Sequence, residues 1–265
     1  MSLSTAVTPR TQAGRSRGVL ASIGWILILP AVILIGWAIT AATVDSLVFP
    51  GPLQSLARLG EDLSEPGFRQ SIVSTVTLLL AGWSLAVIVG TLVGFALGLS
   101  NFWSAVFETP LFALYSIPKV TLYPVFLLFL GIGDASRLTF AFFHGVFPIA
   151  LLVMAATRSM DKNFLKLADV LVLPWYTRLR LILIPALLPS IVTAVRIAFG
   201  LTLLGLILAE MFSAQSGLGR ELVSNVANVR VDHIAGQVVF IAILAVIPGF
   251  ALRWGEKRIT RRYGS

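Results

Sequence analysis

The sequence predicts an all-α integral membrane protein with six transmembrane helices. Three observations carry this prediction. Hydrophobic residues make up 57% of the 265 residues and charged residues only 12%, about half the charged fraction of a soluble domain. Six segments are long and apolar enough to cross a bilayer, which takes about 20 residues. Basic residues gather at the ends of these segments, where they set the orientation of a membrane protein.

The predicted organisation is one transmembrane domain, residues 19–265, after a disordered cytoplasmic tail, residues 1–18. The tail is rich in Ser, Thr and Arg. The first span is retained because its apolar run is longer than the about 7–15 residues of a secretory signal core. The expected spans are 19–42, 71–99, 103–130, 137–157, 182–209 and 234–253.

Charge asymmetry predicts that both termini lie in the cytoplasm. With that orientation, the cytoplasmic segments carry 13 Lys and Arg residues and the external segments carry five. The opposite orientation reverses this asymmetry. The polar segment 158–181, between the fourth and fifth spans, therefore lies on the cytoplasmic side.

The second predicted span carries four glycines near one helical face. Gly82, Gly90, Gly94 and Gly98 are separated by eight, four and four residues. Glycine on such a face lets a neighbouring helix approach closely. We therefore expect these positions to serve helix packing rather than gating.

The third predicted span is expected to be broken. Pro110, Pro118 and Pro124 interrupt it, and proline removes a backbone donor and kinks a helix. Broken backbone at membrane depth occurs where it lines a cavity or is buried in protein. Lys119 therefore either lines a translocation path or extends to the interface, whereas Glu108, near the cytoplasmic start, is expected at the interface.

Two further charges belong to the fifth predicted span or its external end. Arg196 lies eleven residues past Pro185, roughly 16 Å along a helix, so we expect it near mid-membrane. An unpaired arginine there is costly, so it should face a polar cavity, another subunit or a carboxylate. Glu210 lies too far along the helix to pair with it. We take Lys119, Arg196 and Glu210 as candidates for a translocation path, and a structural pairing of Arg196 stays open.

Several functional classes are disfavoured by what the sequence lacks. It has no cysteine, and two histidines are too few for a histidine metal site, so no metal or cofactor is expected on this chain. No phosphate-binding Gly-x-x-x-x-Gly-Lys-Ser/Thr motif and no hydrolase or metalloprotease motif occurs, so we assign no catalytic residue. The net charge of +8 lies at membrane boundaries and does not indicate nucleic acid binding.

Segment 158–181 has the composition of a small docking surface. Trp175 and Tyr176 are aromatic anchors, and Lys162, Lys166 and Arg178 form a charged rim. The same composition also suits an amphipathic helix that lies on lipid headgroups. The residues alone leave both interpretations open.

A series of short motifs follows in order after residue 48. They are Phe49-Pro50-Gly51-Pro52, Ser116-Ile117-Pro118-Lys119, Phe129-Leu130-Gly131-Ile132-Gly133, Phe147-Pro148-Ile149, Leu187-Leu188-Pro189-Ser190-Ile191, Arg196-Ile197-Ala198, Ala209-Glu210-Met211 and Gly217-Leu218-Gly219. Together they resemble the permease subunits of bacterial ATP-binding-cassette importers, in the branch of nitrate, sulfonate and taurine systems. The resemblance implies the fold of a type I importer permease, which carries a solute path and no bond chemistry.

The resemblance also implies cytoplasmic coupling helices. In the family, this loop reads Glu-Ala-Ala, three residues, Gly, nine residues and Ile-x-Leu-Pro. Counting back from Pro185 places lysine and valine where the family has glutamate and glycine, while Asp169 offers a displaced acid and Pro174 a turn. The residues implied to contact the ATPase are Lys166, Leu167, Ala168, Asp169, Val172, Pro174, Trp175 and Tyr176.

The implied partners are two cytoplasmic ATPase subunits that bind ATP and Mg²⁺, a second permease, identical or paralogous, and an external solute-binding protein. Membrane lipid surrounds the assembly in the bacterial inner membrane. Lys119 and Arg196 favour a small anion such as a sulfonate, taurine, nitrate or an organic acid, although the branch also transports vitamin precursors and aromatic compounds. The main alternatives are an ATP-independent secondary transporter or channel, which predicts intramembrane carboxylates and an inverted repeat, and a membrane-embedded enzyme.

Overall fold

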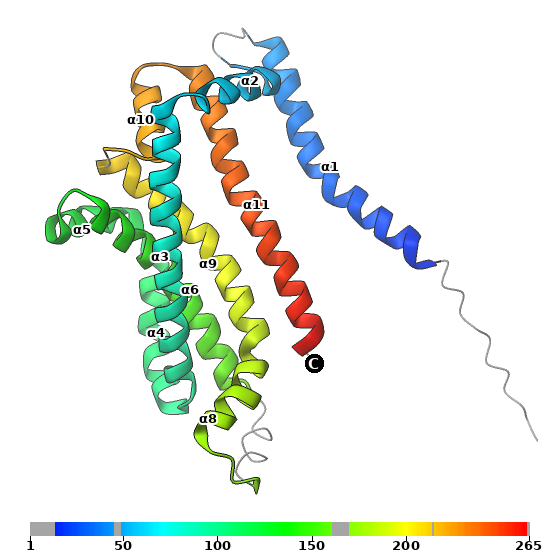
Figure 1. Cartoon of the computed structure of the whole chain (residues 1–265), viewed down its shortest axis with the longest axis vertical. Helices are drawn as coiled ribbons and strands as arrows, with labels where there is room; N and C mark the ends of the chain where they lie inside the picture. Colours follow the sequence, from blue (N-terminus) through cyan, green and yellow to red (C-terminus); the bar gives the residue numbers. More distant parts are fainter. Residues whose placement is uncertain (1–13, 45–48, 161–169, 214, 264–265) are drawn as a thin grey trace, which may run out of the picture.

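A computed structural model of the chain describes residues 14–44, 49–160, 170–213 and 215–263 (Figure 1). All regular structure in these ranges is helical, which confirms the predicted all-α class. A 3₁₀ turn, Lys119–Leu122, precedes α5 (Tyr123–Leu130). A π-helical turn, Leu179–Leu183, joins α8 (Trp175–Arg178) to α9 (Ile184–Ser213). The helices are α1 (Gly14–Thr43), α2 (Pro52–Asp62), α3 (Pro66–Gly98), α4 (Asn101–Ser116), α5 (Tyr123–Leu130), α6 (Asp134–Arg158), α8 (Trp175–Arg178), α9 (Ile184–Ser213), α10 (Leu218–Ala227) and α11 (Val231–Tyr263).

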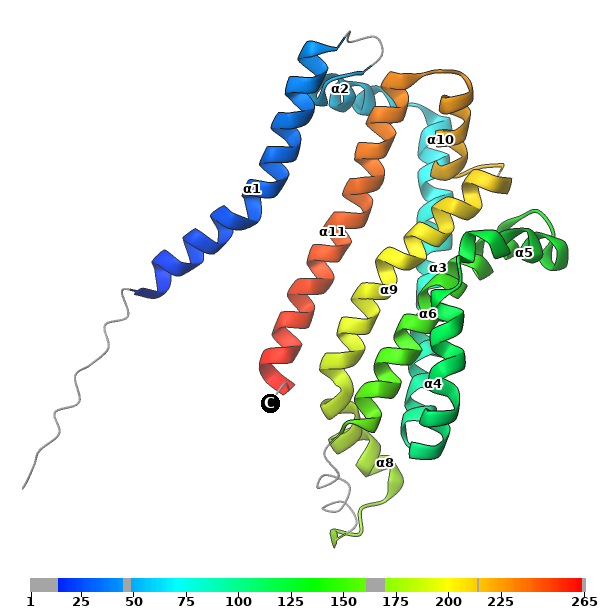
Figure 2. The ribbon, with the colours of Figure 1, turned by 180° about the vertical axis from the view of Figure 1, so that it is seen from behind.

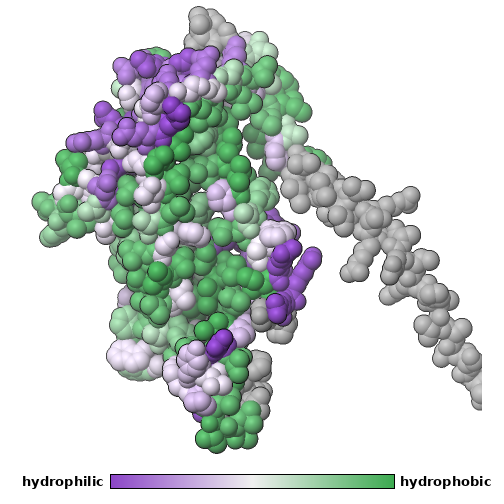
Figure 3. Space-filling view, in the orientation of Figure 1, coloured by the Kyte–Doolittle hydropathy of each residue, from purple (hydrophilic) through white to green (hydrophobic). Residues whose placement is uncertain are grey.

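The long helices form an elongated bundle with α6 at its centre. In the most apolar stretch of α6, 61% of the residues are buried, against 11% in α11. Small and β-branched side chains of α3, α6 and α9 fill the core between them, among them Ala86, Ile149, Val153, Ala194 and Ala198. Figure 3 shows a broad hydrophobic surface with hydrophilic residues gathered over α2 and α10 and again near the C-terminal end of α11. This distribution is typical of a membrane-spanning bundle.

Four helical segments in the described ranges are long and apolar enough to cross a membrane: 66–98, 134–158, 175–213 and 231–262. They correspond to the second, fourth, fifth and sixth predicted spans. The third consists of two helical parts bent by 86° at Ile117 and Pro118, which confirms that it is broken. The first lies in α1, whose apolar part Ile28–Thr43 is shorter. The described residues thus hold four such segments, or five with the bent pair, and the number six stays a prediction.

The glycines of α3 lie against α6, as their spacing predicts. A Cβ on Gly90 would lie 2.8 Å from the Cβ of Ile149, and one on Gly98 would lie 2.5 Å from the Cβ of Thr157. A Cβ on Gly94 would lie 2.5 Å from the carbonyl oxygen of Ala150. The two backbones are therefore too close for any larger residue at these positions.

Gly94→Ala is expected to lower the unfolding free energy by about 1–3 kcal/mol, because the added methyl group meets a backbone carbonyl that cannot rotate away. Thermal unfolding of the purified protein in detergent measures this loss. Gly255→Ala is the matched control, since no atom lies within 4 Å of a Cβ built on that helical glycine of α11. Equal unfolding temperatures for the two variants would contradict the close packing of α3 on α6.

Helix α1 lies apart from the bundle. Figures 1 and 2 show it leaning away from the other helices and approaching them near α2. There the Trp37 indole N–H donates to the carbonyl of Pro50 at 3.1 Å. Most described apolar side chains of α1 are exposed, as expected for a helix that faces lipid or another subunit.

Candidate functional site

The segment that leads into α8 exposes apolar and aromatic side chains at one end of the molecule. Val170 is 78% exposed, Val172 83%, Trp175 57% and Tyr176 68%. Adjacent exposed apolar residues of this kind mark an interaction surface. We call residues 170–176 the end patch. Four of the predicted contact residues, Lys166, Leu167, Ala168 and Asp169, lie outside the described residues.

The turn before α8 lies at Val172. Pro174, the turn residue that the sequence predicts, does not form it. Val172 has a φ of 48°, in the left-handed region that β-branched residues rarely adopt. Pro174 is extended, with φ −63° and ψ 150°, and its carbonyl accepts the N–H groups of Thr177 at 2.9 Å and Arg178 at 3.1 Å. The Arg178 guanidinium donates to the carbonyl of Leu173 at 2.7 Å. This geometry gives a physical reason for a glycine at position 172.

Val172→Gly is expected to stabilise the turn by about 1 kcal/mol, because glycine adopts positive φ without a steric cost. The amides of Thr177 and Arg178 should then exchange with deuterium about fivefold more slowly, because a free energy of about 1 kcal/mol corresponds to a fivefold change in the opening equilibrium. Val172→Ile keeps the β-branched strain and serves as the control. Faster exchange in the glycine variant than in the isoleucine variant would contradict this account.

Lys119 is buried beside aromatic rings. Only 8% of the residue is exposed, and its ammonium group lies 4.9 Å from the ring centre of Tyr115 and 5.5 Å from that of Phe147. An ammonium group over an aromatic face is attracted by the electron-rich ring. Lys119 therefore points into the protein, which favours the path interpretation over extension to the interface.

Arg196 is paired with a carboxylate from α11. Its Nε donates to Oε2 of Glu256 at 2.6 Å, and the Thr193 hydroxyl donates to Oε1 of the same carboxylate at 2.6 Å. Of the three environments that the sequence allowed, the structure shows the carboxylate, and Arg196 also lines a polar cavity. The pair joins α9 to α11.

The mid-membrane depth of Arg196 stays a prediction. Its partner Glu256 belongs to the last, charged turns of α11, next to Lys257 and close to Arg253. Arg196 itself lies in the middle part of one helical segment that runs from Trp175 to Ser213. The ion pair therefore places Arg196 level with the charged end of α11.

Glu210 is fully buried where α3, α9 and α10 meet. Its carboxylate accepts the Thr75 hydroxyl at 2.8 and 3.0 Å and the Gly219 N–H at 2.9 Å. The N–H of Leu218 donates to the Thr75 hydroxyl oxygen at 2.9 Å. Gly217, at φ 116°, brings the chain so close that a Cβ there would lie 2.5 Å from the Glu210 carboxyl carbon. This closed network gives Glu210 a structural role, and its place in a translocation path stays a prediction.

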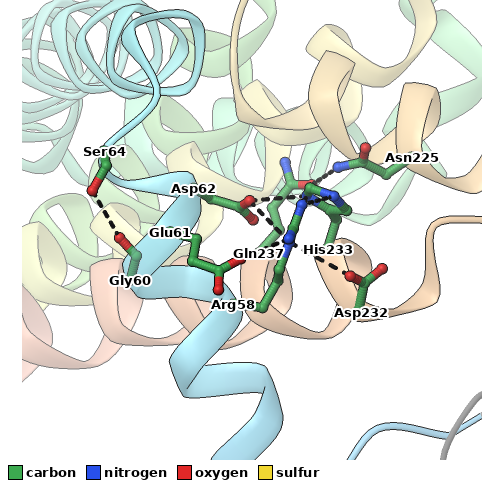
Figure 4. A network of polar contacts seen from close by, with 9 residues as sticks. All are labelled: Arg58, Gly60, Glu61, Asp62, Ser64, Asn225, Asp232, His233 and Gln237. Carbon is green, nitrogen blue, oxygen red and sulfur yellow. Dashed lines mark hydrogen bonds and ion pairs between the residues drawn. The ribbon is translucent and has the colours of Figure 1, made fainter.

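A second polar network joins α2 to the start of α11 (Figure 4). The Arg58 guanidinium contacts the His233 ring and lies 2.7 Å from Glu61, 3.4 Å from Asp62 and 3.5 Å from Asp232. His233 Nδ1 lies 2.9 Å from Asp62 Oδ1. Burial raises the pKa of the Asp62 carboxyl, although His233 and Arg58 favour its charged form. These contacts hold α2 across the end of the bundle.

A cavity of about 910 Å³ lies between α4, α6 and α9. Its lining is mostly apolar. Its polar lining includes Arg158 and Glu108, which form an ion pair at 2.9 Å. Tyr115 lines the cavity and also contacts the Lys119 ammonium group. Lys119 is therefore linked to this cavity through Tyr115 and does not line it, while Arg196 and Glu210 lie in separate clusters.

Sequence reasoning missed the residues that complete these clusters. Glu256 was placed beyond the predicted span 234–253, so its pairing with Arg196 was not foreseen, although α11 runs on to Tyr263. A single threonine such as Thr75 in an apolar helix gives no sequence signal that it will bind a carboxylate. Arg137 is the first residue of the predicted span 137–157; it lies in α6, is 4% exposed and donates to the carbonyl of Ser216 at 2.9 Å.

Comparisons with known proteins agree with this architecture. The chain is 23% identical over 256 residues to a putative aliphatic sulfonates transport permease protein of Bacillus subtilis, covering 95% of this chain and 91% of that protein. It is 27% identical over 256 residues to the taurine transport system permease protein of Escherichia coli, covering 94% and 92%.

Solved structures and a family description point the same way. A bacterial ABC transporter involved in the import of the acidic polysaccharide alginate has a similar fold, with a TM-score of 0.64, 15% identity and coverage of 92% of this chain and 95% of that chain. The description of a binding-protein-dependent transport system inner membrane component matches residues 86–265, more than half of the sequence. The chain therefore belongs to the family of binding-protein-dependent transport system inner membrane components and is a permease subunit of an ABC importer.

Proposed function

We propose that this permease couples ATP hydrolysis to solute import through the end patch. The single observation that carries the proposal is the exposure of Trp175 and Tyr176, the first two residues of the short helix α8. Exposed aromatic anchors of this kind are typical of residues that contribute most of the binding energy at an interface. The patch contacts a cytoplasmic ATPase, and ATP with its Mg²⁺ is bound by that partner rather than by this chain.

The proposed assembly contains two ATPase subunits, two permeases and an external solute-binding protein. Both termini and the end patch face the cytoplasm, as the charge asymmetry favours. The second permease is either a copy of this chain or a paralogue that carries the family's glutamate and glycine. The external protein docks at the opposite end, where α2 and α10 lie.

The proposed solute is a small anion, with a sulfonate such as taurine as the first candidate. The relatives described above transport aliphatic sulfonates and taurine. The buried Lys119 ammonium group, which contacts the cavity-lining residue Tyr115, offers the positive charge that such a solute requires. Arg196 adds less, because Glu256 already neutralises it.

Uptake into proteoliposomes tests this proposal. The permease is reconstituted with its cognate ATPase and binding protein, and labelled taurine uptake is measured with and without ATP. We expect ATP-dependent uptake that unlabelled sulfonates inhibit and a neutral vitamin precursor does not. Lys119→Met should raise the substrate concentration needed for half-maximal uptake about tenfold or more, because it removes a buried cation.

Two results separate the parts of this proposal. A tagged permease that brings down no ATPase from its native membrane would contradict the coupling role. ATP-dependent uptake of a neutral solute, with sulfonates unable to compete, would retain the coupling role and contradict the anionic substrate.

A further inference from the structure

The C-terminal end of α11 and Arg196 of α9 line an open basic cavity. Its volume is about 700 Å³, and it is lined by Arg196, Arg253, Glu256, Lys257, Thr260 and Arg261. Four of these six side chains are basic and one is acidic, and the pair between Arg196 and Glu256 neutralises only one of the four. Figure 3 shows the hydrophilic surface that results near this end of α11. Arginine and lysine side chains gathered in this way bind phosphate oxygens.

An apolar groove continues from this cavity along α9 and α11. Its volume is about 280 Å³, and Arg196 and Arg253 line both spaces. A Cβ on Gly200 or Gly249 would meet no atom within 4 Å, so these two glycines leave the groove open. The remaining residues that line it are Phe199, Ala245, Val246 and Phe250. A cationic cavity joined to an apolar groove has the polarity of a phospholipid, with a charged head and a hydrocarbon tail.

We propose that this composite site binds one anionic phospholipid, with its phosphate in the basic cavity and an acyl chain in the groove. Basic pockets between membrane helices suit anionic headgroups, which are concentrated in the cytoplasmic leaflet. Trp254 follows Arg253 in the sequence, and its ring lies 3.9 Å from the Arg258 guanidinium, an aromatic–basic pair that is typical of a membrane interface. The proposal rests on the cytoplasmic assignment of this end in the proposed function. The bound lipid would hold α9 and α11 together beside Arg196 and Glu256.

Lipid retention by the assembled transporter tests the site. The purified complex is equilibrated with micelles that contain equal amounts of phosphatidylglycerol and phosphatidylcholine, and the lipids that remain bound are measured by native mass spectrometry. We expect selective retention of phosphatidylglycerol. Arg253→Gln combined with Lys257→Gln should reduce it about tenfold or more, because each cation near an anionic headgroup contributes roughly a fivefold gain in binding.

Two further variants make the test specific. Arg220→Gln combined with Arg230→Gln removes the same charge near the opposite end of the bundle and should leave retention unchanged. Gly249→Leu keeps every charge but fills the groove, so it should reduce lipid retention while leaving the binding of inorganic phosphate unchanged. Equal retention by the parent and the Arg253/Lys257 variant overturns the proposal. So does displacement of the bound anion by inorganic phosphate with no effect of Gly249→Leu, since that result identifies a site for a soluble anion.

The lipid site and the import function fail in different measurements. Lipid retention is measured without ATP, solute or binding protein, so it does not depend on transport. Absence of ATP-dependent uptake by a complex that still retains phosphatidylglycerol contradicts the import function alone. Full uptake by a complex that retains neither lipid selectively contradicts the lipid site alone.

Discussion

Replacing Trp175 and Tyr176 together by alanine is expected to remove most of the ATP hydrolysis that solute-loaded binding protein stimulates, and most of the uptake. Both side chains are more than half exposed, so the permease fold does not depend on them. If they are the anchors of the ATPase interface, each truncation costs about 2 kcal/mol or more, and the pair lowers the affinity of the permease for the ATPase by roughly a thousandfold. Copurification and ATPase assays in proteoliposomes measure the two effects.

Trp103→Ala provides a matched control for this variant. Trp103 is 50% exposed in the first turn of α4, toward the same end of the bundle, but it lies outside the end patch. Its loss should leave ATPase binding and uptake close to the parental level. Parental uptake by the Trp175/Tyr176 variant would contradict the coupling role and favour the alternative in which this segment lies on lipid headgroups.

The turn that presents these aromatic residues contains Val172, one of the positions at which the sequence departs from the family pattern. The family pattern has glycine at position 172, and valine there has a left-handed conformation at φ 48°. Glycine adopts this conformation without a steric cost, whereas valine pays about 1–2 kcal/mol in strain. The departure from the pattern therefore has an energetic cost at the turn that presents Trp175 and Tyr176.

Local patterns predicted much of the fold because they depend on neighbouring residues. The glycine spacing identified the face of α3 that packs on α6, and the prolines identified the break between α4 and α5. Both follow from helical geometry over a few turns. The same reasoning placed the segment that leads into α8, residues 170–176, at an end of the bundle.

The polar partners could not be predicted because they come from distant parts of the chain. Arg196 is 60 residues from Glu256, and Glu210 is 135 residues from Thr75. A charge in an apolar segment signals that a partner exists, but only the packing of the helices selects which one. The ends of the helical segments were also hard to predict, since the helices extend beyond the apolar windows that reveal them.

Glu210→Ala is expected to produce the largest loss of stability among the single substitutions considered. The carboxylate is fully buried and accepts the Thr75 hydroxyl and the Gly219 N–H, so its removal leaves both donors without that acceptor. Each unsatisfied buried group costs about 1–3 kcal/mol, so we expect a total loss of roughly 3–5 kcal/mol. Thermal unfolding in detergent measures the loss, and limited proteolysis near α10 locates it.

Glu210→Gln separates the structural role from a role in the solute path. The amide has the same shape, and its oxygen can accept the Gly219 N–H, so the variant should keep most of the stability that Glu210→Ala loses. If Glu210 acts only by holding α10 against α3, uptake by the glutamine variant should follow its stability and stay near the parental level. Lost uptake by a glutamine variant of parental stability would instead place the negative charge of Glu210 in the translocation path. Because Gly217 and Gly219 both lie directly against this side chain, a shift of α10 would act directly on Glu210 of α9.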